Sequence, residues 1–240
     1  MCETEPGVTV RLRYDEGVNL HRPPLSECAP EVESAGATLA VERLHLWRGQ
    51  RHVLRGLGFA VHGGEFVHLK GPNGCGKTSL LRTLAGFLWP EEGVIRWRGV
   101  PVSEDRDGYA ADLAYLGHEN ALKGDLTALE NLRFSTNLRT RTDDATLHRT
   151  LEELGVGRQA DLPVRVLSAG QKRRVAMARV LLSGATLWLL DEPFTNLDVA
   201  GVGDFARLIA AHAARGGIAL VTSHADIELD AGRVRELVVA

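Results

Sequence analysis

The stretch that decides the fold is Gly71-Pro72-Asn73-Gly74-Cys75-Gly76-Lys77-Thr78. It follows an apolar run at residues 66–69 and leads into a helix predicted over residues 77–87. A G-x-x-x-x-G-K-[ST] pattern between a strand and a helix is typical of a phosphate-binding loop, because its glycines let backbone N–H groups approach phosphate oxygens. In such a loop Lys77 neutralises the β- and γ-phosphates, and the Thr78 hydroxyl ligates Mg²⁺. The sequence therefore predicts a site for a nucleoside triphosphate with Mg²⁺.

The helix that opens at Lys77 supports the same interpretation, because the positive end of its dipole points at the bound anion. We therefore assign the run from Gly71 to Ser79 to nucleotide binding. A purely structural turn is the alternative, and the flanking strand and helix disfavour it. Cys75 lies inside the loop, where a helix N-terminus favours a thiolate, but a small residue that simply fits is the interpretation we prefer.

The bulk properties of the chain limit its class. Its 240 residues fit one α/β domain with a buried core, and a net charge of −3 gives no sign of a nucleic-acid partner. Cys2, Cys28 and Cys75 are scattered and odd in number, which suits a reducing compartment rather than a disulfide framework. No apolar run reaches the roughly 18 to 20 residues that span a bilayer, and no signal-peptide pattern is visible. We therefore expect any membrane role to work through a separate subunit.

The chain divides near residue 36. Residues 1–36 combine charges with several prolines and show no sustained period, so we predict a poorly ordered N-terminal extension. Over residues 38–61 apolar positions recur on both sides of a Gly49-Gln50 break, which predicts a small antiparallel sheet ahead of the phosphate loop. Trp47 in this sheet could present its ring to adenine or pack on the sheet. Both interpretations stay open, because Arg48 competes for the same place.

Helical patterns dominate the middle of the chain. Short strands are predicted at residues 94–97 and 113–117. A capping box of Thr127 and Glu130 then opens a helix predicted over residues 127–138, and a second helical stretch covers residues 142–154. We therefore predict a helical insertion over about residues 118–180 within a nucleotide-binding domain at residues 37–240.

A second group of chemically important residues follows this insertion. Leu167-Ser168-Ala169-Gly170-Gln171 precedes a helix predicted over residues 172–182, which Ser168 can cap. The buried-strand run at residues 187–190 ends in Asp191 and Glu192. Asp191 can hold Mg²⁺ through water, and Glu192 can polarise an attacking water. The alternative, an acidic turn after a core strand, loses weight because a phosphate loop lies upstream.

A further buried strand is predicted over residues 218–222, and it ends in Ser223 and His224. A histidine at the end of a strand is usually structural or exposed. In open α/β folds, however, ligands bind at the carboxyl ends of the parallel strands. We therefore favour contact of His224 with the γ-phosphate, and we predict that Lys77, Glu192 and His224 form the catalytic group.

With these motifs in this order, and with Asn196-Leu197-Asp198 after Glu192, the sequence resembles the nucleotide-binding subunits of ABC transporters over about residues 38–240. The resemblance implies an α/β P-loop NTPase fold, with a RecA-like core, a small antiparallel β subdomain and a helical insertion. It also implies a head-to-tail homodimer in which each ATP lies between the phosphate loop of one copy and residues of the other. Those residues would be Ser168, Ala169, Gly170 and Gln171, with Asp198 in the loop that communicates across the dimer.

Within that superfamily the sequence is similar to the ATP-binding subunits of haem exporters of cytochrome c biogenesis. The similarity rests on residues 115–118, 126–132, 167–182 and 185–194. His118 stands where most ABC relatives have Gln, which is usual in this subfamily, and we include it among the nucleotide-site residues. The sequence departs from the pattern at Glu119-Asn120, where Gln-Pro is more usual, and residues 1–36 have no counterpart in it.

The resemblance implies a subunit that hydrolyses ATP and powers a separate integral membrane permease, with haem as the cargo. Such a subunit would be peripheral to the cytoplasmic face of the bacterial inner membrane, with no transmembrane segment of its own and no nucleic-acid partner. An ATPase subunit of a different ABC exporter is one alternative, since its catalytic residues would be identical. A soluble ABC-type ATPase acting on nucleic acid or ribosomes is another, but it predicts tandem ATPase halves, coiled coils or a basic surface.

Overall fold

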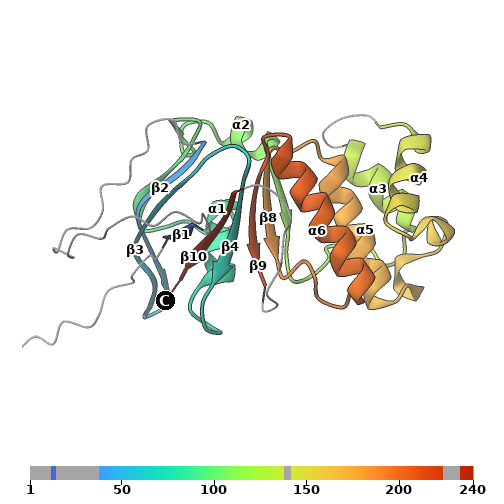
Figure 1. Ribbon diagram of the computed structural model, residues 1–240, viewed down its shortest axis with the longest axis horizontal. Helices are drawn as coiled ribbons and strands as arrows, with labels where there is room; N and C mark the ends of the chain where they lie inside the picture. The colour runs from blue at the N-terminus through green and yellow to red at the C-terminus, as the bar shows by residue number, and fades with distance from the viewer. Residues whose placement is uncertain (1–11, 15–37, 138–141, 224–232, 240) are drawn as a thin grey trace, which may run out of the picture.

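The predicted strand, loop and helix lie at the centre of the structure (Figure 1). This computed structural model describes residues 12–14, 38–137, 142–223 and 233–239, and in it β4 (Glu65–Lys70) leads through the phosphate loop into α1 (Lys77–Leu84). The prediction extended this helix to residue 87. It ends earlier because Gly86 takes a left-handed conformation, with φ of 77°, which is typical of a helix C-terminus.

A six-stranded sheet positions the phosphate loop. Its strand order is β1 (Leu12–Tyr14), β10 (Arg233–Val238), β4, β9 (Ile218–Thr222), β8 (Leu187–Asp191) and β7 (Leu113–Leu116). β1 pairs antiparallel with β10, and the other neighbouring strands are parallel. Leu69 and Asp191 both pair with Thr222. The carboxyl ends of β4, β8 and β9 therefore meet at one edge of the sheet, where α/β folds bind ligands.

A second, antiparallel sheet covers one side of this arrangement. Its strand order is β3 (Arg51–Val61), β2 (Leu39–Arg48), β5 (Glu92–Trp97) and β6 (Val100–Pro101). β2 and β3 confirm the sheet predicted over residues 38–61. The strand predicted at residues 94–97 forms within β5, but the sequence pattern did not assign it to this sheet, because the phosphate loop separates it from β2 along the chain.

Apolar side chains of the parallel sheet alternate between two cores. Trp188 and Leu190 of β8 pack in one core with Phe205 of α6 (Val199–Ala214). Leu187 and Leu189 of the same strand pack in the other core with α1 and the antiparallel sheet. This alternation follows from the two-residue period of a strand. All of β8 is buried, as expected for a strand covered on both faces.

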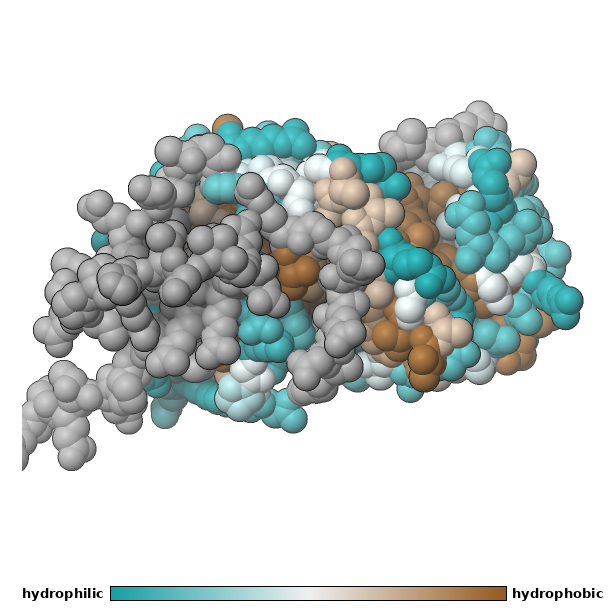
Figure 2. All heavy atoms as spheres, viewed as in Figure 1, coloured by the Kyte–Doolittle hydropathy of each residue, from teal (hydrophilic) through white to brown (hydrophobic). Residues whose placement is uncertain are grey.

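The helices other than α1 and α2 (Arg106–Ala111) gather on the α6 side of the sheet (Figure 1). They are α3 (Ala128–Asn137), α4 (Asp144–Glu153), α5 (Ala169–Leu182) and α6, with short 3₁₀ turns at η1 (Gly157–Gln159) and η2 (Val164–Val166). α5 contacts β7 and α6 contacts β4 and β9, whereas α3 and α4 pack on α5. Figure 2 shows hydrophilic and hydrophobic residues mixed on the surface of this helical end.

Two helix starts confirm the predicted capping. Thr127 Oγ1 accepts a hydrogen bond from the Glu130 N–H at 3.1 Å, and the Thr127 N–H donates to the Glu130 carboxylate at 2.8 Å. Ser168 and Gln171 form the same reciprocal pair at the start of α5. Both caps involve residues three positions apart, so the sequence predicts them. The sequence did not predict α2, α6 or β10.

Some predictions fall on parts of the chain that the structure does not describe. Of the extension predicted over residues 1–36, only β1 is described, and it forms a strand. Leu138, the predicted end of α3, also lies outside the described residues. Within the described ranges, no helix combines the length and the apolar character needed to cross a membrane.

The packing of Phe205 leads to a prediction about the stability of the fold. Phe205 is fully buried between α6 and the parallel sheet, so Phe205→Ala should lower the free energy of unfolding by about 3–5 kcal/mol through lost burial and a residual cavity. Phe87→Ala is the control, because Phe87 is 62% exposed and its ring meets that of Tyr115 edge to face. Its loss should stay below about 1.5 kcal/mol. Urea denaturation measures the free energy of unfolding of both variants. Equal losses in the two variants would contradict the burial of Phe205 in this core.

Candidate functional site

A hollow of about 400 Å³ lies where the phosphate loop meets the carboxyl end of β8. Its floor is the loop and the first turn of α1, at residues 73, 74 and 76–79. Asp191 and Glu192 line it from the end of β8, and Arg48 and Arg51 line it from the hairpin between β2 and β3. The structure thus brings together the two groups of residues that the sequence placed far apart along the chain.

The glycines of the loop are required by close packing. Gly76 caps α1 with φ of 113°, and a Cβ there would lie 2.9 Å from Val53 Cγ1. Gly71 has φ of 148°, and a Cβ there would collide with the Val239 carbonyl oxygen. Both φ values lie in a region that only glycine adopts readily. The loop can therefore bring its backbone close to a ligand only with glycine at these positions.

The lysine of the loop points into the loop itself. Lys77 is only 9% exposed, and its Nζ donates hydrogen bonds to the carbonyl oxygens of Gly71 at 2.6 Å and Pro72 at 3.1 Å. This places a positive charge beside the N-terminus of α1, which is itself positive. Cys75 is half-buried and packs against the core beneath the antiparallel sheet, which favours its interpretation as a small packing residue.

The buried carboxylate of Asp191 is incompletely satisfied. Asp191 is 1% exposed, and its Oδ1 accepts hydrogen bonds from Thr78 Oγ1 at 3.1 Å and Thr222 Oγ1 at 2.8 Å. Its Oδ2 is buried and has no hydrogen-bond partner among the described residues. A buried carboxylate oxygen without a partner is costly, and a cation would remove the cost. One carboxylate and one hydroxyl next to a phosphate site fit Mg²⁺, which binds few protein ligands alongside substrate phosphates.

Glu192 follows Asp191 in a strained conformation. Its φ of 52° is left-handed, which costs a non-glycine residue roughly 1–2 kcal/mol. Its N–H donates to Thr222 Oγ1 at 2.9 Å, and its half-buried side chain lines the hollow. Strain of this kind persists only where the surrounding structure holds it, often at functional sites. Thr222 was missed by sequence analysis, and its position as the last residue of the predicted strand over residues 218–222 was the one signal that the sequence offered.

The segment at residues 168–171 lies away from this hollow. Ser168 and Ala169 are exposed, and neither they nor Gly170 and Gln171 line the hollow. A Cβ on Gly170 would lie 2.7 Å from the Asn196 carbonyl oxygen, so the start of α5 packs closely on the loop before α6. Within one chain the structure therefore does not bring this segment to the phosphate loop.

Asp198 ends that same loop and caps α6. Its carboxylate accepts hydrogen bonds from the Gly201 N–H at 3.0 Å and from Arg174 Nη2 at 3.1 Å. The Gly201 hydrogen bond is the main reason that the pKa of Asp198 lies below its usual value, and Arg174 adds to it. The exposed carboxylate is thus held ionised and fixed in place.

The remaining site predictions have different outcomes. Trp47 stacks on His52, with ring centroids 3.7 Å apart, and does not line the hollow. His118 is exposed just after β7 and also does not line it. His224 lies outside the described residues. Arg51, whose Nη2 donates to the Gly74 carbonyl at 2.8 Å, was not predicted, since no local pattern links the hairpin to the loop.

Comparison with known proteins agrees with this geometry. A family model described as ABC transporter matches residues 54–195. The cytochrome c biogenesis ATP-binding export protein CcmA of Dechloromonas aromatica is 48% identical over 202 residues, which cover 83% of this chain and 98% of that protein. CcmA of Yersinia pestis is 43% identical over 84% of this chain and 93% of its own length.

Solved structures agree as well. A putative ABC transporter ATP-binding protein from Pyrococcus furiosus superposes with a TM-score of 0.72 at 25% identity, covering 83% of this chain and 96% of that one. The structure of an ATP-binding subunit of an ABC transporter gives a TM-score of 0.71 at 28% identity, over 78% of this chain and 80% of that one. The chain therefore belongs to the ATP-binding family of ABC transporters, among the CcmA cytochrome c biogenesis ATP-binding export proteins.

Proposed function

We propose that the chain hydrolyses MgATP in the hollow beside the phosphate loop and drives a separate membrane permease. The observation that carries this proposal is the buried, unpartnered Oδ2 of Asp191, on a carboxylate that the Thr78 hydroxyl also contacts. Mg²⁺ that Asp191 and Thr78 would hold beside a bound nucleotide would account for the arrangement. An acidic turn with only a structural role does not explain a buried carboxylate oxygen without a partner.

Each group in the hollow then has one task. Lys77 and the N-terminus of α1 balance the charge of the β- and γ-phosphates. Thr78 and Asp191 would hold Mg²⁺, which would supply positive charge to neutralise the transferred phosphoryl oxygens. Glu192 accepts a hydrogen bond from the attacking water and orients it toward the γ-phosphorus. His224 keeps its proposed contact with the γ-phosphate, as a residue outside the described ranges.

A second copy of the chain would complete each site. The Ser168 hydroxyl, the backbone N–H groups after it and the positive end of α5 suit a γ-phosphate, yet they do not line the hollow of their own chain. Gln171 shapes this turn through its capping hydrogen bond. In a head-to-tail homodimer these groups bind the ATP of the partner subunit. Hydrolysis removes the charge that holds the halves together, which makes the dimer a two-state switch.

The Glu192→Gln variant tests both the proposed base and the proposed ATP-dependent dimer. The variant keeps the shape of the side chain but loses the base, so phosphate release should fall by about 10²–10⁴-fold. ATP should still bind, and ATP-bound dimers should accumulate on size-exclusion chromatography with light scattering. Unchanged phosphate release would remove Glu192 as the base.

The matched control adds Ser168→Arg to Glu192→Gln. A bulky cation at the start of α5 blocks the approach of the second copy but leaves the phosphate loop intact. The double variant should therefore bind ATP as a monomer. ATP-dependent dimers that persist in the double variant would contradict the shared site.

We propose that the adenine ring lies over Arg48 rather than Trp47. Arg48 is exposed and lines the hollow, whereas the Trp47 ring is already stacked on His52. Adjacent residues of a strand point to opposite faces, so the two side chains do not share one site. A guanidinium plane stacks well on the π-face of a base.

Two single variants separate these alternatives. Arg48→Ala should weaken ATP binding about twofold to fivefold, the size expected for one exposed cation–π contact. Trp47→Ala should leave the dissociation constant unchanged. Isothermal titration of ATP into each variant measures both, and the reverse pattern would place adenine on Trp47.

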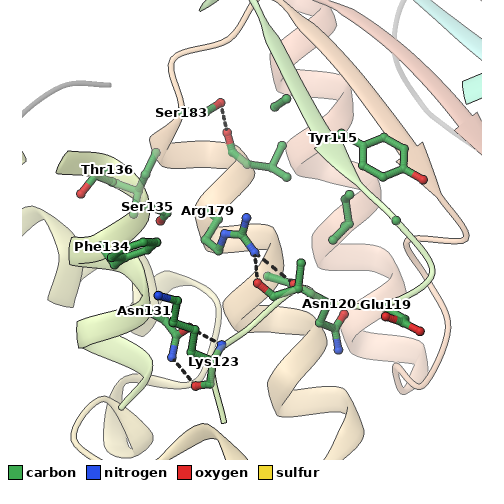
Figure 3. Close-up of a pocket in the computed structure, with 17 residues that line it drawn as sticks. Tyr115, Glu119, Asn120, Lys123, Asn131, Phe134, Ser135, Thr136, Arg179 and Ser183 are labelled. Atoms are coloured by element: carbon green, nitrogen blue, oxygen red, sulfur yellow. Dashed lines mark hydrogen bonds between the residues drawn. The ribbon is translucent and has the colours of Figure 1, made fainter. Parts of the chain in front are cut away.

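A second hollow, of about 290 Å³, is proposed as the docking site for the membrane partner (Figure 3). It lies between the segment after β7, α3 and α5, and we call it the insertion groove. Phe134 is 49% exposed at its rim, with Lys123 Nζ 3.8 Å from the ring centroid. Phe87, 62% exposed, contacts Tyr115, which also lines the groove. Exposed aromatic side chains around a hollow are typical of interaction sites.

The occupant that we propose is a cytoplasmic segment of an integral membrane permease of the CcmB type. The names of the similar proteins, which describe ATP-binding export in cytochrome c biogenesis, support this partner. By the same inference the cargo is haem, and the chain is peripheral to the cytoplasmic face of a bacterial inner membrane. A different ABC exporter would use the same ATP site, so only the membrane partner discriminates. A net charge of −3 does not favour nucleic acid or ribosomes.

Affinity capture of the full chain from native membranes, read by mass spectrometry, tests the partner. A CcmB-type permease should be recovered with the wild-type chain and lost with Phe134→Glu, because a buried charge opposes docking. Val100→Glu is the control, since Val100 is 45% exposed on β6 and does not line the groove. Recovery of another exporter permease, or of ribosomal proteins, would favour one of the alternatives.

A further inference from the structure

The most heavily bonded buried charge in the described chain is Arg173, on the second turn of α5. It is 2% exposed, and all five of its hydrogen-bond acceptors are neutral oxygens. Burial lowers the pKa of Arg173 to about 10, so the guanidinium is still protonated at neutral pH. A buried cation is costly unless its donors are satisfied. The position of Arg173 is therefore fixed by its acceptors.

These acceptors belong to two separate segments. The first is the turn at the end of β8, where Nη2 donates to the carbonyl oxygens of Asp191 at 2.8 Å and Glu192 at 2.7 Å, and Nε donates to that of Pro193 at 3.0 Å. The second is the segment after β7, where Nη1 donates to the Gly117 carbonyl at 2.8 Å and to Asn120 Oδ1 at 3.0 Å. One rigid, planar group thus joins both segments.

The two segments have different roles in the proposed function. The turn at the end of β8 carries the proposed base, Glu192, whose left-handed φ of 52° must be held by its surroundings. The Thr222 hydroxyl holds the N–H of Glu192, and Arg173 holds its carbonyl oxygen. The segment after β7 forms a wall of the insertion groove through Gly117 and Asn120.

We propose that Arg173 is a positioning residue that couples occupation of the insertion groove to the orientation of Glu192. This inference rests on the proposed function. A partner that contacts the groove wall moves the 117–120 segment, and the planar guanidinium carries this movement to the Glu192 carbonyl. The Glu192 carboxylate then turns relative to the attacking water, and misplacement by about 1 Å costs about 10²-fold in rate.

Arg179, on the same helix, provides a matched comparison. Its Nη1 donates to the carbonyl oxygens of Asn120 at 3.1 Å and Ala121 at 2.8 Å, as Figure 3 shows. It therefore holds the same groove wall, and burial lowers its pKa as well. Its hydrogen bonds do not reach the turn at Asp191, Glu192 and Pro193. A general effect of losing a buried arginine on α5 would appear at both positions.

The first experiment measures ATP turnover of the full chain as Arg173→Lys and as Arg179→Gln. Lysine keeps the charge of Arg173 but cannot bond both segments at once. For Arg173→Lys, kcat should fall about 10- to 100-fold with KM and the ATP dissociation constant unchanged. For Arg179→Gln the fall in kcat should be smaller, because Arg179 makes no hydrogen bond to the turn at residues 191–193. An unchanged kcat for Arg173→Lys, a parallel rise in KM, or an equal loss in Arg179→Gln would overturn the inference.

The second experiment measures hydrogen exchange with ATP bound, and it does not require a folded Arg173 variant. Asn120→Ala removes an acceptor of Arg173 from the groove wall without altering α5. Amide exchange should quicken at residues 187–192 as well as at 117–121. Exchange that quickens only at 117–121 would overturn the link.

The coupling itself is measured by hydrogen exchange in the presence of the permease, co-purified from native membranes. Adding the permease should change exchange at residues 187–192 in the wild-type chain and leave it unchanged in Asn120→Ala. An equal change in both would overturn the inference. A wild-type chain that hydrolyses no ATP would instead refute the proposed function, so the two failures are distinguishable.

Discussion

The chemistry of this chain depends on one hydroxyl group at the end of β9. Thr222 Oγ1 donates to Asp191 Oδ1 at 2.8 Å and accepts from the Glu192 N–H at 2.9 Å. A hydroxyl has one hydrogen to donate, and here it is committed to Asp191. This fixes which carboxylate oxygen faces β9, and Oδ2 has no hydrogen-bond partner among the described residues. A second hydrogen bond to the same hydroxyl anchors the backbone of Glu192, so one neighbour positions two adjacent acidic residues.

Arg173 holds the same peptide backbone as this hydroxyl, at the other polar group of Glu192. Thr222 holds the N–H of Glu192, while Arg173 holds its carbonyl oxygen from α5. Since α3 and α4 pack on α5, the orientation of the helical part relative to the sheet depends largely on that helix. The polar contacts of α5 therefore lie at the joint between the helical part and the ATP site. Apolar packing fills the two cores, but these directed bonds determine the geometry of the site.

Local features of the fold and site were predictable from sequence, and non-local ones were not. The caps at Thr127 and Ser168 depend on residues three positions apart, and both formed as predicted. The phosphate loop and the strand before Asp191 were recognised from short patterns in the same way. The pairing of β5 with β2 and the bond from Thr222 to Asp191 join distant segments, and no short pattern encodes such contacts. The proposal that adenine lies over Arg48 rather than Trp47 depends on which of the two side chains lines the hollow, which the sequence alone does not give.

The short strand β1 has a consequence for how the protein behaves in solution. It adds antiparallel to β10, and without it β10 would be the outer strand of the six-stranded sheet. An outer strand offers a row of backbone donors and acceptors that other chains can join, which favours aggregation. A short segment near the N-terminus thus covers an edge of the sheet that would otherwise be open to pairing with other chains. Shortened versions of the chain that begin after Tyr14 would lose this protection even if their ATP site were intact.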